Sequence, residues 1–237
     1  DVCSSDLELS ARENMPLVSQ PANALALAAP PTSNPAAAIA TSNKLWALAN
    51  NGDVPGARGK TAHMVLNMTG ILPRNDLFDI ASVVGEFTWN RVMSVTSDPF
   101  GLYKGTATYA AGSTAGAPNI DAVTRDATTL GLIFTPTWLA ALPETDISMP
   151  ISYNVGLSGQ SGVTSGGAKN SGTWSIGVAA DYQQKYNFAL RYIAAFGPYA
   201  KTTVALPGVP AGVAGVAPGY APLSDRDMLV FTFKTTF

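Results

Sequence analysis

The sequence predicts an all-β fold, specifically an antiparallel transmembrane β-barrel of the outer-membrane type with about eight strands in this chain. The first observation is the end of the chain, where residues 228–237 alternate between apolar and mostly polar side chains. Leu229, Phe231, Phe233 and Phe237 share one face of that strand, because side chains alternate across a strand. Three phenylalanines on one exposed face would promote aggregation in water, so the pattern favours contact with lipid.

Composition is the second observation. Only 13% of the 237 residues are charged, yet no run of 18 apolar residues occurs. A spanning helix needs such a run, whereas a transmembrane barrel dilutes its apolar residues to every second position. The net charge of −2 provides no basic field for nucleic acid. Composition alone leaves a soluble β-sandwich open as the alternative.

The third observation is that long and short connections alternate between the expected strands. Residues 13–57, 96–126 and 198–225 are long links, 72–79, 139–145 and 183–185 are short, and 160–171 is of intermediate length. Outer-membrane barrels have long external loops and short periplasmic turns, so the alternation favours that class. The Ala- and Pro-rich stretch 21–40 and the Gly-, Ala- and Pro-rich stretch 206–222 are expected to be mobile external loops. A short helix is expected at residues 42–50, directly after the first stretch.

Period-two alternation locates the strands. In chain order they are residues 7–12, 58–71, 80–95, 127–138, 146–159, 172–182, 186–197 and 226–237. The first is a remnant, whereas several others match the roughly 9–11 residues that cross a bilayer. Pro150 interrupts the fifth strand, and because proline cannot donate to a ladder we expect a bulge or a local edge there.

The sixth and seventh strands form the best-defined hairpin. A tight turn at residues 183–185 pairs Tyr182 with Tyr186. The same register places Ala180 beside Phe188, Val178 beside Leu190, and Gly177 beside Arg191. Small residues then lie opposite large ones, and Gly177 leaves room for the guanidinium.

Alternation also divides the polar and aromatic side chains into two sets. A charge on the lipid face costs a few kcal/mol, so Glu86 must point inward while its neighbours Phe87 and Trp89 point outward. The candidate lumen-lining residues are Glu86, Asn90, Asn154, Asp181, Asn187, Arg191 and Lys234. The candidate membrane-facing or aromatic-girdle residues are Phe87, Trp89, Trp138, Tyr153, Trp174, Tyr182, Tyr186, Tyr192, Phe231 and Phe233. The lumen set either selects solutes in a conduit or only satisfies and stiffens the wall.

These segments resemble the proteobacterial outer-membrane barrel family known as domain of unknown function 1302. The matching stretches are residues 12–19, 59–67, 76–96, 134–159, 182–197 and 223–237. The resemblance implies a large barrel of which this chain is the carboxyl-terminal part, with Phe237 as the assembly signal that the barrel-assembly machinery recognises. It also implies hydrophobic substrates, and it supplies no catalytic or ligand residues.

The amino terminus has a separate origin in our interpretation. Residues 1–7 match the in-frame translation of a sequencing-library adapter, so we expect residues 8–237 to be the native part of a single barrel domain. A longer assembly of the locus should lack these seven residues and extend upstream. Cys3, the only cysteine, then has no role, and no disulfide or thiolate metal site forms.

Few side chains offer chemistry. His63 is the only histidine, which excludes a multi-histidine metal site and leaves one candidate base for an outer-membrane hydrolase. Arg91 is expected to extend toward lipid headgroups from the outward face. Asp98 and Asp121 lie in links, where they could contact a divalent cation that bridges lipopolysaccharide, but two separate carboxylates do not form a calcium loop. We predict no catalytic residue, no metal and no cofactor.

The sequence therefore predicts an outer-membrane barrel that passes or docks hydrophobic or amphiphilic small molecules without making or breaking a bond. Its expected partners are outer-membrane lipid, lipopolysaccharide, the assembly machinery and such small molecules, but not nucleic acid. A non-conducting scaffold barrel beside an export system and a hydrolase that uses His63 are the alternatives. Because the first strand is clipped, we expect an open or poorly closed curved sheet with a free edge at the second or the final strand.

Overall fold

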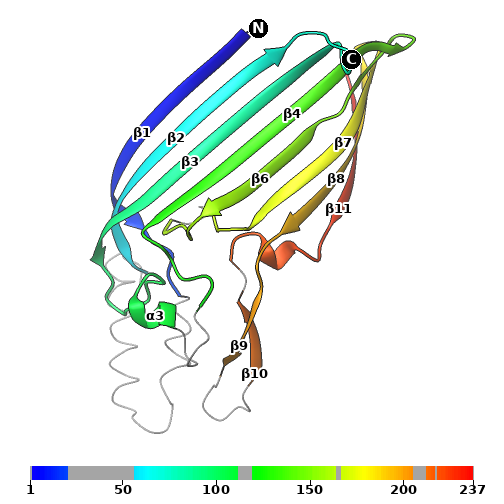
Figure 1. The fold of residues 1–237 in the computed structure, drawn as a ribbon. Coiled ribbons are helices and arrows are strands. Elements are labelled where there is room, and N and C mark those ends of the chain that lie inside the picture. The colour runs from blue at the N-terminus through cyan, green and yellow to red at the C-terminus, as the bar shows by residue number, and fades with distance from the viewer. Residues whose placement is uncertain are drawn as a thin grey trace.

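The protein forms one curved antiparallel sheet of nine strands, with a separate two-stranded ribbon at one end (Figure 1). The computed structural model describes residues 2–20, 56–111, 119–163, 167–204, 212–216 and 218–236. The sheet strands are β1 (Val2–Pro16), β2 (Arg58–Leu72), β3 (Ile80–Ser97), β4 (Asp126–Leu142), β5 (Thr145–Ser148), β6 (Ile151–Ser158), β7 (Gly172–Tyr182), β8 (Tyr186–Phe196) and β11 (Met228–Thr235). Each strand pairs with its sequence neighbours, except that β5 and β6 share one position between β4 and β7.

The sheet is open, as expected. Strands β1 and β11 are its two edges, and neither pairs with the other. The final strand is thus an edge as predicted, but the other edge is β1 and not the second strand. The predicted first strand, residues 7–12, was too short because residues 2–6 continue the ladder, from Val2 opposite Ile71 to Asp6 opposite Asn67. Among the described residues the main sheet is a single layer with no second sheet packed on it, unlike a sandwich.

The hairpin of β7 and β8 has the predicted register. Tyr182 lies opposite Tyr186, Val178 opposite Leu190, and Gly177 opposite Arg191. A side chain at Gly177 would meet the Leu190 carbonyl oxygen at 2.8 Å and Arg191 Cα at 3.3 Å. Glycine therefore lets the two backbones approach closely beside the arginine.

Proline divides the fifth predicted strand into β5 and β6. Pro150 has no N–H to donate, but its carbonyl oxygen accepts the Gly177 N–H at 3.0 Å. The preceding Met149 N–H donates to the Pro136 carbonyl oxygen at 3.0 Å. The ladder is thus interrupted for two residues while both flanking strands remain bound to their neighbours, as the position of Pro150 predicted.

Short and long links lie at opposite ends of the sheet. The short-link end holds residues 73–79, 143–144 and 183–185, together with both ends of the chain (Figure 1). The long-link end holds residues 98–125, with helix α3 (Ala107–Ala111), and residues 159–171. Among the described residues no helix is both long and apolar enough to span a membrane.

The link that follows β8 contains structure that the sequence analysis missed. Its backbone forms the antiparallel ribbon of β9 (Ala200–Val204) and β10 (Gly212–Val216), followed by the 3-10 turn η1 (Ala221–Leu223). The expectation of a mobile external loop at 206–222 stays a prediction, but it did not anticipate this ribbon, although β-branched residues at 202–204, 213 and 216 favour strands despite the surrounding glycines. The predicted loop 21–40, the predicted helix 42–50 and Phe237 lie outside the described residues.

A cluster of buried apolar side chains lies at the long-link end, while others, such as Phe78 and Ala81, are buried elsewhere. Leu17, Ala57, Val92, Tyr103 and Val123 pack together there, and Leu17 is only 4% exposed. On the strands, by contrast, large apolar side chains stay open, with Leu229 68% and Phe231 66% exposed. The protein thus has a small core at one end and a long wall of strands without a core of its own.

Candidate functional site

The strand register divides the wall into two faces, which we call the polar face and the aromatic face. Residues directly opposite each other in neighbouring strands point to the same side of a sheet. One row of opposed residues crosses six strands in the order Asn67, Glu86, Gly131, Asn154, Thr173 and Ala195. The row beside it contains Leu66, Phe87, Leu130 and Val155. The polar face contains the first row, and the aromatic face contains the second.

All seven candidate lumen residues lie on the polar face, although they do not form one cluster. Asp181 lies opposite Asn187, which in turn lies opposite Lys234, near the short-link end. Glu86 and Asn154 flank Gly131 in the middle of the wall. Glu86, Asn154, Arg191 and Lys234 are exposed, Asp181 and Asn187 are half-buried, and Asn90 is buried. Asp181 Oδ1 is buried without a hydrogen-bond partner among the described residues.

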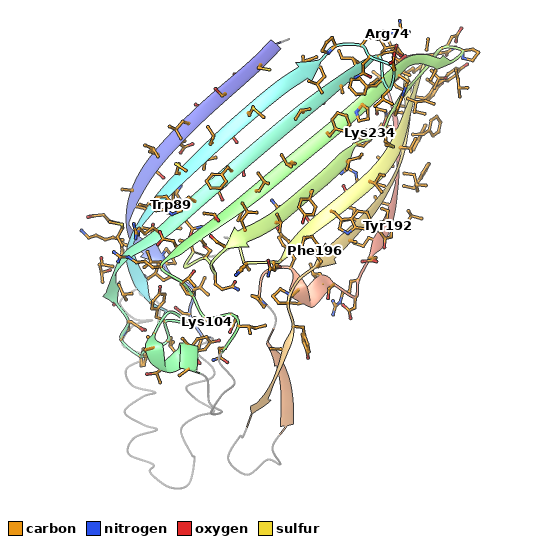
Figure 2. The ribbon with its side chains drawn as sticks, in the orientation of Figure 1. Arg74, Trp89, Lys104, Tyr192, Phe196 and Lys234 are labelled. Atoms are coloured by element: carbon orange, nitrogen blue, oxygen red, sulfur yellow. The ribbon has the colours of Figure 1, made fainter. Side chains whose placement is uncertain are left out.

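All ten candidate aromatic residues lie on the opposite face, and several form stacked pairs. Figure 2 shows side chains extending from both sides of the wall, with Trp89, Tyr192 and Lys234 labelled. The Trp174 and Tyr192 rings lie 5.4 Å apart, and Tyr182 stacks on Tyr186 at 6.3 Å. Such pairs contribute about 0.5–1.5 kcal/mol beyond their buried area. Near the short-link end, five rings line an apolar hollow, namely Tyr182, Tyr186, Phe188, Phe231 and Phe233.

Strand β1 follows the same division at residues 6–8. Asp6 and Glu8 lie opposite Asn67 and Val65 on the polar face, whereas Leu7 lies opposite Leu66 on the aromatic face. Leu7 is 57% exposed, like the other large side chains of that face. Ser5, which lies opposite Met68, by contrast places a hydroxyl group on the aromatic face.

An ion pair lies on the aromatic face near the long-link end. Arg91 Nε lies 3.2 Å from Asp126 Oδ1, without the geometry of a hydrogen bond, and Trp89 Nε1 donates to the same oxygen at 3.1 Å. Arg91, which we expected to reach toward headgroups, is thus held against a carboxylate of the adjacent strand. The sequence analysis missed this partner because Asp126 is 35 positions away in sequence.

The link between β6 and β7, described at residues 159–163 and 167–171, folds back over the polar face at the long-link end. Ser161 Oγ donates to Asn90 Oδ1 at 3.0 Å, and the Gly162 carbonyl oxygen accepts the Val18 N–H at 2.9 Å. A side chain at Gly162 would collide with Val92, and one at Gly167 with Thr129. These glycines therefore let the link lie directly on the strands, which explains why Asn90 is buried while Glu86 is exposed.

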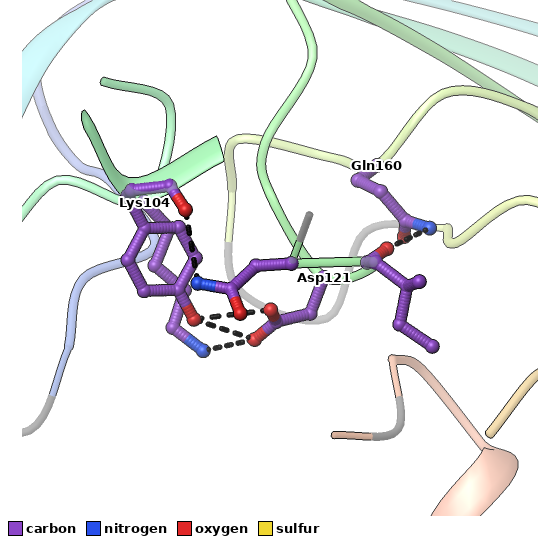
Figure 3. Close-up of polar contacts among 6 residues, drawn as sticks. Lys104, Asp121 and Gln160 are labelled. Carbon is purple, nitrogen blue, oxygen red and sulfur yellow. Dashed lines mark hydrogen bonds and ion pairs between the residues drawn. The ribbon is translucent and has the colours of Figure 1, made fainter. Parts of the chain in front are cut away.

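A polar network ties the link 98–125 together beside this fold-back (Figure 3). Lys104 Nζ lies 2.7 Å from Asp121 Oδ2, and the Tyr109 hydroxyl donates to both Asp121 oxygens at 2.9 and 3.0 Å. Burial and the neighbouring Asp121 carboxylate raise the pKa of Tyr109 well above its ordinary value. Gln160 Nε2 donates to the Ile120 carbonyl oxygen at 3.1 Å and so joins the two links.

The carboxylates in this region are used within the protein. Asp98 accepts the N–H groups of Leu102 and Tyr103 at 2.8 and 3.1 Å, while Asp121 is bound by Lys104 and Tyr109. Across the described part of the chain, no group of three or more metal-binding side chains is present. These contacts give both carboxylates partners within the protein.

A pocket of about 580 Å³ lies between these links. Its walls come from the segment after β1, the links 98–125 and 159–171, and the turn that precedes η1, through Val18, Lys104, Gln160, Val163 and Tyr220 among others. None of these side chains was a candidate site residue. They are scattered through links without a spacing pattern, so the sequence carried no signal for them beyond the note on Asp121.

His63 lies on the polar face of β2, opposite Asn90. Its Nε2 lies 2.8 Å from Thr61 Oγ1, and Thr61 is only 1% exposed. No carboxylate within the described ranges forms a hydrogen bond or an ion pair with the ring. The geometry thus gives His63 a buried hydroxyl as its neighbour and no acid to orient it.

The fold and the site define a class: an all-β protein whose open antiparallel sheet has one polar and one aromatic face. Within that class, the chain belongs to the family described as "Protein of unknown function (DUF1302)", whose model matches residues 3–237. The resemblance drawn from the sequence is thereby confirmed. No curated protein and no solved structure matches the chain. The adapter origin of residues 1–7 stays a prediction, which the upstream sequence of the locus will test.

Proposed function

We propose that this chain is the carboxyl-terminal part of an outer-membrane β-barrel that passes or docks hydrophobic or amphiphilic small molecules. The observation that carries the proposal is the complete separation of the two candidate sets, seven polar residues on one face and ten aromatic residues on the other. A wall with one polar and one apolar face is what a barrel needs when lipid lies outside and water inside. Among the described residues no second sheet packs on either face, and the link after β6 covers the polar face only at the long-link end.

Exposure of the aromatic face supports lipid as its surroundings. Phe231, Phe233 and Leu190 are 66%, 50% and 48% exposed, and they are neighbours on β8 and β11. In water such a continuous apolar surface is an aggregation hazard, whereas in hydrocarbon its exposure has no such penalty. The polar face, which bears Glu86, Arg191 and Lys234, would then line the water-filled interior and act on solutes by charge and hydrogen bonding.

The two free edges support a longer barrel. Outer-edge N–H and C=O groups of β1 and β11 would each cost several kcal/mol if left unpaired in hydrocarbon. Both edge strands reach the short-link end with the chain termini, β1 leaving it and β11 arriving at it (Figure 1). Antiparallel closure therefore needs an even number of additional strands. We propose that upstream strands of the full-length protein supply them.

Transport and docking require no bond chemistry. The proposed partners are outer-membrane lipid and lipopolysaccharide on the aromatic face, the barrel-assembly machinery, and hydrophobic or amphiphilic small molecules. In this proposal Phe237, which lies outside the described residues, is the assembly signal. Nucleic acid is not a proposed partner, because the net charge is −2.

The test is solute flux through the full-length gene product reconstituted in liposomes. We expect conductance or liposome swelling above that of protein-free vesicles. A correctly inserted protein without flux would favour the scaffold alternative, which the packing of the link 159–171 over the polar face supports. Solubility of the full-length protein without detergent would contradict the membrane proposal altogether. Loss of lipid or ester hydrolysis in the His63→Ala variant would instead support the hydrolase.

A further inference from the structure

The pocket at the long-link end has a composition that selects a ligand class. We propose that it binds an uncharged amphiphile, an alkyl chain with a hydroxyl-bearing head. This inference rests on the proposed function and specifies its substrate class. The pocket volume of about 580 Å³ lies in the range typical of small-molecule sites.

One part of the pocket is apolar. Leu17, Val18 and Val163 line it from the segment after β1 and from the link 159–171, and Ala168 and Pro218 add to it. Leu17 and Ala168 are 4% and 6% exposed. An alkyl chain placed against these side chains is removed from water, which contributes about 0.8 kcal/mol for each buried methylene group.

The other part is polar but carries no net charge. Lys104 and Asp121 line it as an ion pair at 2.7 Å, with side chains 21% and 15% exposed. The Tyr109 hydroxyl donates to the same carboxylate. An anionic head would have to compete with Asp121 for Lys104, and a cationic head with Lys104 for Asp121. Either competition leaves a partly buried charge with a weaker partner, which is costly.

The side-chain carbonyl oxygen of Gln160 is the group that we expect to bind an uncharged head. Its Nε2 is engaged by the Ile120 carbonyl oxygen at 3.1 Å, whereas its side-chain carbonyl oxygen has no hydrogen-bond partner among the described residues. A hydroxyl group of the ligand can donate to that oxygen. The discrimination thus comes from an available acceptor beside a charge pair that is already satisfied.

Backbone contacts hold the pocket walls in place. The Leu17 N–H donates to the Ala57 carbonyl oxygen at 2.9 Å, and the Lys104 N–H to that of Val18 at 3.2 Å. The Tyr220 N–H donates to Ser171 Oγ at 2.7 Å. A pocket whose walls are already bonded to one another loses little conformational freedom when a ligand binds.

The experiment uses the full-length gene product in lipid nanodiscs and a photoactivatable monolauroylglycerol as the probe. Cross-linked residues are mapped by mass spectrometry, with monolauroylglycerol, laurate and dodecylammonium as competitors of equal chain length. We expect labelling at residues 17–19, 160–163 and 167–168, and about tenfold stronger competition by the neutral compound than by either ion. Val163→Trp should reduce this labelling about tenfold by filling the pocket, while the matched Val178→Trp on the aromatic face should not.

A variant that neutralises one charge of the pair provides a second measurement, which does not require the Val163→Trp variant to fold. Asp121→Asn keeps the shape but frees Lys104, so laurate should become the best competitor, by about tenfold. Unchanged competitor order in Asp121→Asn, or equal competition by laurate in the native protein, would overturn the inference. Flux is measured on the same samples: flux without pocket labelling refutes this inference alone, whereas labelling without flux refutes only passage.

Discussion

The strand wall and the long-link end are stabilised in opposite ways. Along the wall, ladders join the strands and large apolar side chains such as Phe231 stay exposed. At the long-link end, Leu17 and its neighbours are buried and a polar network joins the links. A protein in water needs the second arrangement everywhere, since burial of apolar surface drives folding. The contrast shows that apolar side chains are buried at the long-link end but exposed on the aromatic face of the wall, and the following predictions test whether the two regions have different surroundings.

The largest effect is expected from a charge placed on the aromatic face. Phe231→Arg should lower the free energy of unfolding in lipid by about 2–4 kcal/mol near the middle of the bilayer, whereas the matched Thr232→Arg on the polar face should cost less than about 1 kcal/mol. Denaturant titration of the full-length protein in vesicles measures both. Equal losses of unfolding free energy for Phe231→Arg and Thr232→Arg would contradict the prediction, because the two faces would then have the same surroundings.

Glycine substitutions test how closely the backbones of neighbouring strands approach each other on the two faces. Gly177→Ala should destabilise the wall by about 1–3 kcal/mol, because the new methyl group would lie 2.8 Å from the Leu190 carbonyl oxygen. Gly85→Ala on the aromatic face is the control, since its methyl group meets only Leu132 at 3.6 Å and Met68 at 3.8 Å. The same denaturant titration applies, and a Gly85→Ala cost as large as that of Gly177→Ala would refute close approach as the cause.

The pH dependence of stability at the long-link end can be tested at Tyr109. Folding raises its pKa, so the neutral phenol is favoured in the fold; the resulting stability is present below the ordinary tyrosine pKa of 10.0 and is lost as pH rises through the higher folded value. Tyr109→Phe should cost about 1 kcal/mol at neutral pH and remove this alkaline loss. Amide hydrogen exchange in residues 98–125 measures both effects. Alkaline loosening that persists in Tyr109→Phe would assign it to another group.

The smallest effect is expected at the ion pair on the wall. Asp126→Asn should cost about 0.5 kcal/mol, because the Arg91 and Asp126 side chains are 36% and 41% exposed and solvent screens their attraction. A double-mutant cycle with Arg91→Gln isolates the pair. A coupling energy of several kcal/mol would place the pair in lipid rather than at the water interface, and would sharpen where the wall leaves the membrane.

Much of the wall could be predicted from the sequence. Alternation in residues 172–197 was enough to set the β7–β8 register, and Pro150 was enough to locate the break between β5 and β6. Both signals are local, since side-chain period and the missing proline N–H act within one strand or one hairpin. The extent of β1 was underestimated, because the pattern of residues 2–6 is weak until β2 pairs with it.

The sequence by itself determined the fold class, the order of the strands and the two faces, because a period of two leaves no choice of side once a strand forms. Only the tertiary structure decided that the link 159–171 returns to Asn90, that Lys104 binds Asp121, and that a pocket opens between them. Those contacts join residues from separate links, where no period constrains the chain and glycines such as Gly162 act only once a strand lies beneath them.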